Sequence, residues 1–214
     1  MSYYVRPMHR EDIPQVNEID RDAFASQWPP PNYLRELQNK LARHVVACDN
    51  ARVIPAPETR VPPRKGISGL TYRLRELFNN GRPTDRQFVL GFAGIWVLAD
   101  EAHITNIAVR SLYQRKGIGE LLLISIIDFS VALKASVVTL EVRVSNEAAQ
   151  SLYRKYGFNE VGLRHGYYTD NRENAVIMTT EGITSAAFRA RLKRMKLAYA
   201  RRYGASIDEM IFTK

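Results

Sequence analysis

The chain has 214 residues, of which 45% are hydrophobic and 25% charged, and this composition is ordinary for a globular protein. Its net charge of +9 implies an acidic partner, such as nucleic acid or a phosphorylated cofactor. The single cysteine, Cys48, excludes an intrachain disulfide and favours a reducing compartment. The N-terminus carries no apolar signal segment, and no apolar stretch reaches the about 20 residues of a spanning helix, so we expect a cytoplasmic protein with no membrane partner.

The first half of the chain predicts a strand, two helices and a second strand. YYVRPM is the first strand, and the two helices run from Asp12 to about Phe24 and over NYLRELQNKLA, with the rigid WPPP loop between them. HVVACDN is the next strand. Residues 51–87 differ in composition from the flanking chain and contain many prolines and arginines. We expect them to form an insertion that leaves the sheet between two strands, called the excursion below.

The second half predicts a crossover in the middle of a sheet. FVLGFAGIWVL and EAHITNIAV form an expected antiparallel hairpin that turns at Ala99 and Asp100. A helix from Gly117, the strand SVVTLEVRV, a helix that Gly157 ends, and the hairpin strands GFNEVGLRHGYY and AVIMTT follow. This order predicts an α/β fold with a mixed, mostly antiparallel sheet flanked by helices and a central strand–helix–strand crossover.

The end of the chain predicts an amphipathic helix with a strongly basic face. Phe188, Leu192, Met195 and Tyr199 recur at helical spacing, and residues 189–202 contain many lysines and arginines but no acidic residue. Contact with nucleic acid is possible, but a solvated surface helix is the favoured interpretation. We therefore expect one domain over residues 1–182, which includes the excursion, and a basic tail over 183–214.

The stretch YQRKGIGELLL places Gly117 and Gly119 between a strand and a helix. A Walker loop is absent, and a dinucleotide fingerprint would need a third glycine. Taken alone, these glycines indicate a tight turn and an anion site about equally. Because Arg115 and Lys116 precede a helix N-terminus with free N–H groups, the whole stretch predicts a cradle for a pyrophosphate.

Four segments together resemble the GNAT superfamily of N-acetyltransferases. They are ITNIAV, QRKGIG, TLEVRVSNEAAQSLYRKYGF and GYYTDNRENAVIM, and within the superfamily they are similar to bacterial ribosomal-protein-alanine N-acetyltransferases and archaeal N-terminal acetyltransferases. The resemblance is loose over residues 1–50 and close over 88–180, while the excursion and the tail depart from the pattern. It implies acetyl-CoA as the co-substrate, no metal, and direct attack of an amine in a ternary complex.

The resemblance also implies roles for individual residues. Glu141 would be the general base, directly or through a water, and Tyr153 would contact CoA and protonate its departing thiolate. Acetyl-CoA would be held by a bulged and splayed strand, by the glycine loop and by the start of the following helix, through Ile107, Ala108, Val109, Gln114, Arg115, Lys116, Gly117, Ile118, Gly119 and Asn146. The acceptor would contact Trp28, His103, Tyr167 and Tyr168.

Each of these residues also has a purely structural interpretation. Glu141 would then be a solvated carboxylate paired with Arg143, Tyr153 a core tyrosine, and Tyr167 and Tyr168 an ordinary strand end. A lone strand histidine such as His103 is more often structural. No histidine pair or Cys/His spacing indicates a metal site.

The favoured function is acetylation of a protein N-terminal α-amine, for which the alanine of a small-subunit ribosomal protein is the expected acceptor. Acetylation of a lysine or a small amine is the alternative. A catalytically silent acyl-CoA sensor and a nucleic-acid-binding module remain as non-enzymatic hypotheses; Glu141 and Tyr153 argue against the first. The positive net charge conflicts with a basic ribosomal peptide, although Asp170 and Glu173 could offset it locally.

Overall fold

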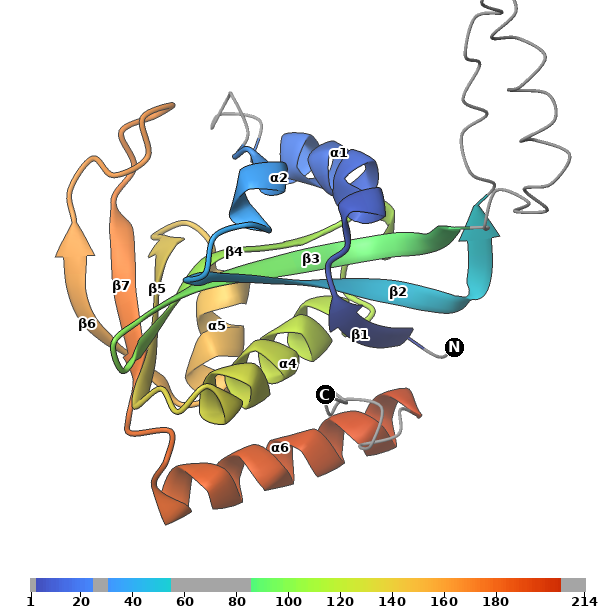
Figure 1. Ribbon diagram of the computed structural model, residues 1–214. Coiled ribbons are helices and arrows are strands. Elements are labelled where there is room, and N and C mark those ends of the chain that lie inside the picture. The colour runs from blue at the N-terminus through green and yellow to red at the C-terminus, as the bar shows by residue number, and fades with distance from the viewer. Residues whose placement is uncertain (1–2, 25–30, 55–85, 205–214) are drawn as a thin grey trace, which may run out of the picture.

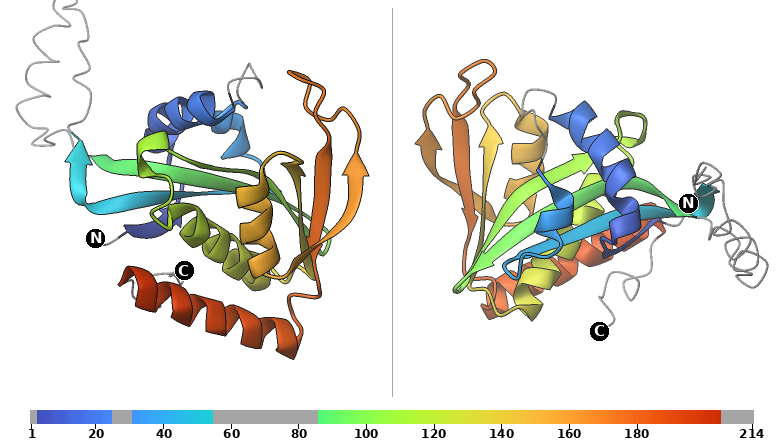
Figure 2. Two further views of the ribbon diagram at one scale, coloured as in Figure 1. Left: turned by 180° about the vertical axis from the view of Figure 1, so that it is seen from behind. Right: turned by 45° about the horizontal axis from the view of Figure 1, so that its top comes forward.

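A computed structural model describes residues 3–24, 31–54 and 86–204. One twisted sheet runs through it, with helices α1 and α2 on one face, α4 and α5 on the other, and α6 outside α4 (Figures 1 and 2). The α/β class and the chain order expected from the sequence are both confirmed.

The sheet has seven strands in the order β1-β2-β3-β4-β5-β7-β6, and β4 and β5 are its parallel pair. Its strands are β1 (Tyr3–Pro7), β2 (Ala42–Ile54), β3 (Arg86–Leu98), β4 (Glu101–Val109), β5 (Val137–Arg143), β6 (Phe158–Arg164) and β7 (Ala175–Thr180). The helices are α1 (Ile13–Ala23), α2 (Tyr33–Glu36), α4 (Ile118–Ala132), α5 (Glu147–Lys155) and α6 (Ala186–Tyr203), with single 3-10 turns at Arg10–Asp12 and Ser111–Tyr113.

Three elements differ in length from the sequence-based expectation. Helix α2 ends at Glu36, because the Asn39 side chain accepts the Leu41 N–H and Ala42 already pairs with β3. Strand β2 continues to Ile54 and β3 begins at Arg86, so both flanks of the expected excursion are paired strand. Strand β6 ends at Arg164, which leaves residues 165–174 as a loop. Residues 55–85 lie outside the described part of the chain.

The two faces of the sheet bury separate apolar clusters. The α1 face is the smaller one and packs Val16, Ile19 and Tyr33 against Phe92 of β3. The other face packs the apolar α4 helix against β2, β3 and β4. Helix α4 has buried residues on nearly all its sides because α6 covers the side that faces away from the sheet.

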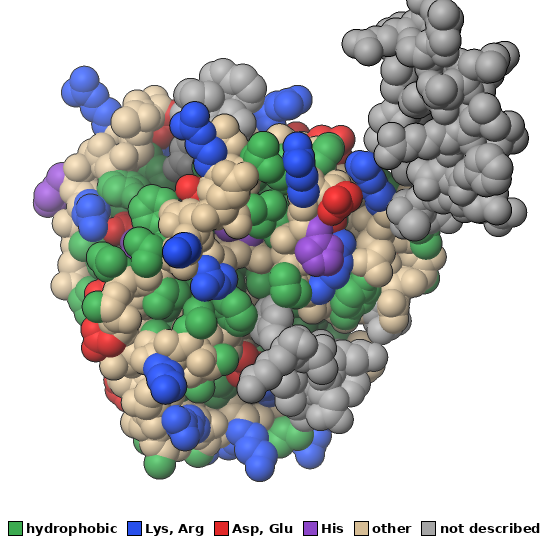
Figure 3. Space-filling view, viewed as in Figure 1, with side chains coloured by type: hydrophobic (Ala, Val, Ile, Leu, Met, Phe, Trp, Pro, Cys, Tyr) green, Lys and Arg blue, Asp and Glu red, His purple; other side chains and the backbone are tan. Residues whose placement is uncertain are grey.

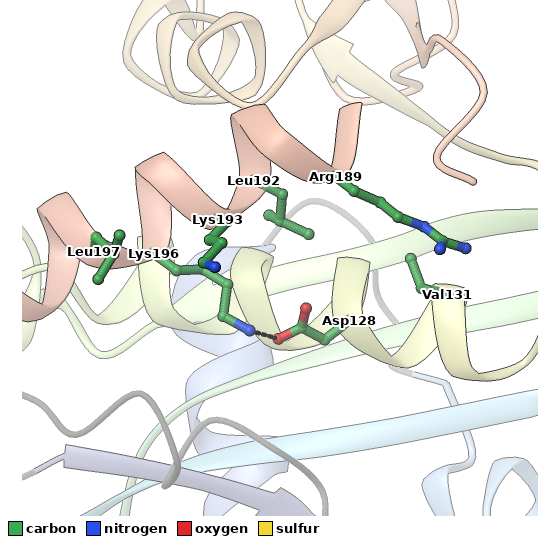
Figure 4. Close-up of a pocket in the computed structure, with 7 residues that line it drawn as sticks. All are labelled: Asp128, Val131, Arg189, Leu192, Lys193, Lys196 and Leu197. Atoms are coloured by element: carbon green, nitrogen blue, oxygen red, sulfur yellow. Dashed lines mark hydrogen bonds and ion pairs between the residues drawn. The ribbon is translucent and has the colours of Figure 1, made fainter. Parts of the chain in front are cut away.

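The tail helix α6 is part of the main core. Its Phe188, Leu192 and Tyr199 are buried in the same cluster as α4, and Lys196 forms an ion pair of 2.6 Å with Asp128 of α4. A 450 Å³ groove lies between the two helices beside this pair (Figure 4). The remaining Lys and Arg side chains of α6 are mostly exposed, and Figure 3 shows such side chains along the lower edge of the molecule, where α6 runs. A solvated basic face stays the favoured prediction, and nucleic-acid contact stays the untested alternative.

None of the helices in the described residues is both long and apolar enough to cross a membrane.

Candidate active site

Strands β4 and β5 separate in the middle of the sheet. They pair only from Glu101–Val137 to Ile104–Leu140, and the β3–β4 register shifts by one residue at Thr105. Beyond this bulge, residues 106–109 of β4 pair with β3 but with no other strand of the described chain, while β5 continues with β7. The bulge and the splay implied by the resemblance are therefore present, and they leave a strand edge at Ile107, Ala108 and Val109.

Glu141 is the first residue of β5 after this separation. In the strand alternation it faces away from Leu140, which is buried against α4, and therefore lies on the α1 side of the sheet. Its side chain is 6% exposed and its two oxygens lie 3.1 Å from His103 Nε2 and 2.9 Å from Arg164 Nη2. The structural interpretation of Glu141 pairs it with Arg143, but the ion pairs of Arg143 are with Asp170 and Glu173. A buried carboxylate held between two basic groups has a fixed position.

Tyr153 projects from α5 and is close enough to Tyr168 for the two side chains to interact electrostatically. Its ring lies 5.7 Å from that of Phe158. Burial raises the pKa of Tyr153, and Tyr168 raises it further. The hydroxyl is thus protonated at neutral pH and has a proton to donate.

Tyr167 and Tyr168 lie in the β6–β7 loop and pack edge to face, with ring centroids 5.1 Å apart. Burial raises the pKa of both, to about 12 for Tyr168, and the charge of Glu141 raises both further. Arg143 lies 3.8 Å above the Tyr168 ring and orders the loop through its two carboxylates. The pair therefore lies near Glu141 in the loop after β6 rather than at the end of a strand, and its contact with an acceptor stays a prediction.

The glycine loop precedes α4 with two residues in left-handed backbone conformations, Arg115 (φ 62°) and Gly117 (φ 83°). Gln114, Arg115 and Lys116 are exposed, and the first N–H groups of α4, from Ile118 and Gly119 on, have no partner within the helix. Such a turn presents successive N–H groups and positive charge to an anion, so the loop fits a pyrophosphate.

Gly117 has a second structural constraint that comes from the tail. A Cβ atom at this position would lie 2.5 Å from Cζ of Tyr203, whereas a Cβ on Gly119 would meet only Val109 Cγ2 at 3.8 Å. Tyr203 stacks on the buried Tyr199 at 4.7 Å. The last turn of α6 therefore packs against the glycine loop through the Tyr203 ring.

The expected contacts of Asn146 with CoA and of Trp28 with the acceptor stay predictions. Asn146 caps α5 by accepting the Ala149 N–H with its Oδ1, so its amide NH₂ is the group left for a ligand. Trp28 lies outside the described residues. Over the described ranges, no group of three or more His, Cys, Asp and Glu side chains is arranged to hold a metal ion.

Sequence reasoning missed Arg164 and Tyr203. No sequence spacing links Arg164 on β6 to Glu141 on β5, because β7 lies between these two strands in the sheet. Tyr203 had a signal, because it continues the helical stripe four residues after Tyr199.

Comparison with known proteins places this geometry in a family. Residues 69–158 match the model of the acetyltransferase (GNAT) family. A Bacillus subtilis (strain 168) protein, whose name provisionally describes a ribosomal protein bS18-alanine N-acetyltransferase, is 33% identical over 175 residues, which cover 81% of this chain and 92% of that protein. The Escherichia coli (strain K12) ribosomal protein bS18-alanine N-acetyltransferase is 44% identical over 105 residues, covering 48% and 71%. The crystal structure of the ribosomal-protein-S18-alanine N-acetyltransferase from Escherichia coli superposes with a TM-score of 0.58 at 28% identity and covers 86% of this chain and 96% of that one.

Proposed function

This chain belongs to the acetyltransferase (GNAT) family and is an N-acetyltransferase, and we propose that it moves the acetyl group of acetyl-CoA to the α-amine of a protein N-terminus. The observation that carries this proposal is the buried Glu141 carboxylate, fixed by His103 and Arg164 where β4 and β5 separate.

The acceptor amine must lose a proton for the reaction to proceed. An α-amine has a pKa of about 8, against about 10.4 for lysine, so it is partly neutral at physiological pH and needs only a modest base. Glu141 receives the proton, directly or through a water, as the amine nitrogen forms its bond to the acetyl carbon. His103 and Arg164 keep the carboxylate in place, and Tyr167 and Tyr168 border the acceptor.

The leaving group needs a proton as the carbon–sulfur bond breaks. Tyr153 donates its hydroxyl proton to the thiolate sulfur as that bond breaks. The free edge of β4 at Ile107, Ala108 and Val109 pairs with the extended arm of CoA, and one of its N–H groups polarises the thioester carbonyl.

The glycine loop holds the pyrophosphate of CoA. Its contributions are the N–H groups at the start of α4 and the exposed charges of Arg115 and Lys116. Asn146 supplies a further contact with its amide.

The alanine of a ribosomal protein is the acceptor that the names of the relatives support. Arg143 pairs with both Asp170 and Glu173 and neutralises only one of their two charges, so the pair keeps a net negative charge that favours a basic peptide. Hydrogen bonds from Ser145 and Arg143 lower the pKa of Glu173 to about 2, which marks it as a structural carboxylate.

Mass spectrometry of peptide panels tests this function. The full chain with acetyl-CoA should acetylate the α-amine of peptides that begin with Ala, and leave an N-terminally acetylated peptide with an internal Lys unmodified. Rapid modification of the internal Lys instead would favour the lysine alternative. Transfer to neither peptide, with acetyl-CoA still bound, would favour a small-amine acceptor or a silent sensor.

Gly117→Ala should weaken acetyl-CoA binding and lower Tm by about 2–8 °C. A left-handed conformation costs an alanine about 1–2 kcal/mol, and the new Cβ displaces Tyr203 from the loop. Gly119→Ala is the matched control for stability, because its Cβ meets only an ordinary contact. Thermal melts with and without acetyl-CoA measure both quantities. Equal Tm values for the two variants would show that the Tyr203 contact does not constrain the loop.

A further inference from the structure

A second, smaller cavity of 120 Å³ lies on the α1 face of the sheet. Side chains from α1, α2, β2, β3 and β4 line it, among them Asp20, Tyr33, Glu36, His44, Trp96 and Asn106. None of the described lining residues is a lysine or arginine, although the protein as a whole carries +9.

Two carboxylates of this lining have only neutral donors as close partners. Asp20 is 4% exposed and accepts the Tyr33 hydroxyl at 2.6 Å, and Glu36 accepts Trp96 Nε1 at 2.9 Å. Burial raises the pKa of Asp20, which is the cost of a charge without a cation beside it. A cation in the cavity would remove this cost.

His44 and Asn106 both line this cavity and carry buried polar atoms without partners among the described residues. The His44 side chain is 2% exposed, and neither of its ring nitrogens has a hydrogen-bond partner among the described residues; Nε2 lies 3.5 Å from Glu36 Oε2, which is too long for a good bond. Asn106 Oδ1 is also buried and unpartnered. The missing side chain of Gly94 lets both approach, since a Cβ there would lie 2.6 Å from His44 Nδ1 and 2.7 Å from Asn106 Oδ1.

The imidazole does not supply the missing positive charge. Burial lowers the pKa of His44, and Glu36 opposes this shift only in part. Acceptors therefore dominate the lining: two carboxylates, one amide oxygen and one imidazole nitrogen. Native proteins rarely leave several buried polar atoms unpaired, and when they do the site commonly binds water or a ligand.

The cavity is next to the acceptor side of the active site. Trp96 on its wall pairs across the strands with His103, which contacts Glu141, and Asn106 follows the bulge at Thr105. Neither His103 nor Glu141 lines the cavity itself. An acceptor whose α-amine reaches Glu141 can therefore place a different group, one of its side chains, in this space.

We propose that this cavity is a subsite for a lysine or arginine side chain within the first few residues of the acceptor, held by Asp20, Glu36 and Asn106. The proposal rests on the proposed function and deepens it. It also explains how a protein with a net charge of +9 accepts a basic side chain, because the attraction comes from the buried Asp20 and the half-buried Glu36.

Peptide kinetics with the full chain test the subsite. The substrates are Ala-initiated peptides that are neutral except for a single Lys at position 2, 3 or 4, each matched with a peptide carrying norleucine at that position. A charged hydrogen bond in a partly dry site should raise kcat/KM at least about tenfold for Lys over norleucine at one of these positions. In Asp20→Asn and in Glu36→Gln this ratio should fall towards one. Asp22→Asn, an exposed carboxylate on the same helix, should keep the wild-type ratio.

Each result separates this proposal from the proposed function. Acetylation of every Ala peptide by the wild-type protein with equal kcat/KM for Lys and norleucine at all three positions would overturn the subsite and leave the function standing. A Lys preference that persists in both carboxylate variants would overturn it as well. No acetylation of any peptide would refute the function itself. The ratio of kcat/KM for Lys over norleucine is measured first on the wild-type protein. It can therefore refute the subsite even if Asp20→Asn does not fold.

Discussion

Glu141→Gln should lower kcat for an Ala-initiated peptide by about 10²–10⁴-fold while acetyl-CoA still binds. Glutamine keeps the shape of the side chain and hydrogen bonds to His103 and Arg164, but it cannot take a proton. The deficit should shrink as the pH rises above the α-amine pKa of about 8, because the amine is then neutral without help from a base. A pH–rate profile of both proteins, from well below to well above that pKa, measures this effect.

The control for this variant is Glu160→Gln. Glu160 is an exposed carboxylate on β6 that pairs with Arg154, so the chemical change is the same and its distance from β5 should leave kcat unchanged. If Glu141→Gln turned over at the wild-type rate at low pH, Glu141 would not be the base. His103, which lies within 3.1 Å of it, would then be the next candidate.

Tyr153→Phe should also lower kcat by about 10²–10⁴-fold, and this loss should persist at high pH. The substitution keeps the ring that packs on Phe158 and removes only the hydroxyl. The deficit lies in the departing thiolate, so a neutral acceptor amine does not relieve it. The same pH–rate profile therefore separates the two roles, and the affinity for acetyl-CoA, measured by calorimetry, should change much less than kcat.

Tyr4→Phe provides the matched control. Tyr4 lies on β1 against the other apolar cluster, and its buried hydroxyl has no hydrogen-bond partner among the described residues. Loss of this hydroxyl should leave kcat and Tm close to their wild-type values. A Tyr153→Phe protein with normal turnover at every pH would exclude the hydroxyl as the proton donor.

The secondary structure followed closely from local patterns. The alternation of apolar and polar residues predicted the strands and their faces, and the apolar residues at helical spacing after Gly117 predicted α4. Gly157 ends α5 as expected, with a φ of 91°. These signals are local because each depends on neighbours within a few residues. The elements that were misjudged, the short α2 and the end of β6, are those whose limits depend on side-chain contacts and strand pairing rather than on periodicity.

The sequence by itself determined the sheet with its central crossover, the glycine turn and the presence of a glutamate on β5 and a tyrosine on α5. Only the tertiary structure decided which charged groups contact one another. In it Glu141 pairs with Arg164 and His103, whereas Arg143 pairs with a carboxylate of the β6–β7 loop. It also brought Tyr203 behind Gly117, and gathered Asp20, Glu36, His44 and Asn106 around one cavity. The reason is that local periodicity fixes the face on which a side chain lies, whereas a contact between distant segments depends on strand order and on competition among all the charges that folding brings together.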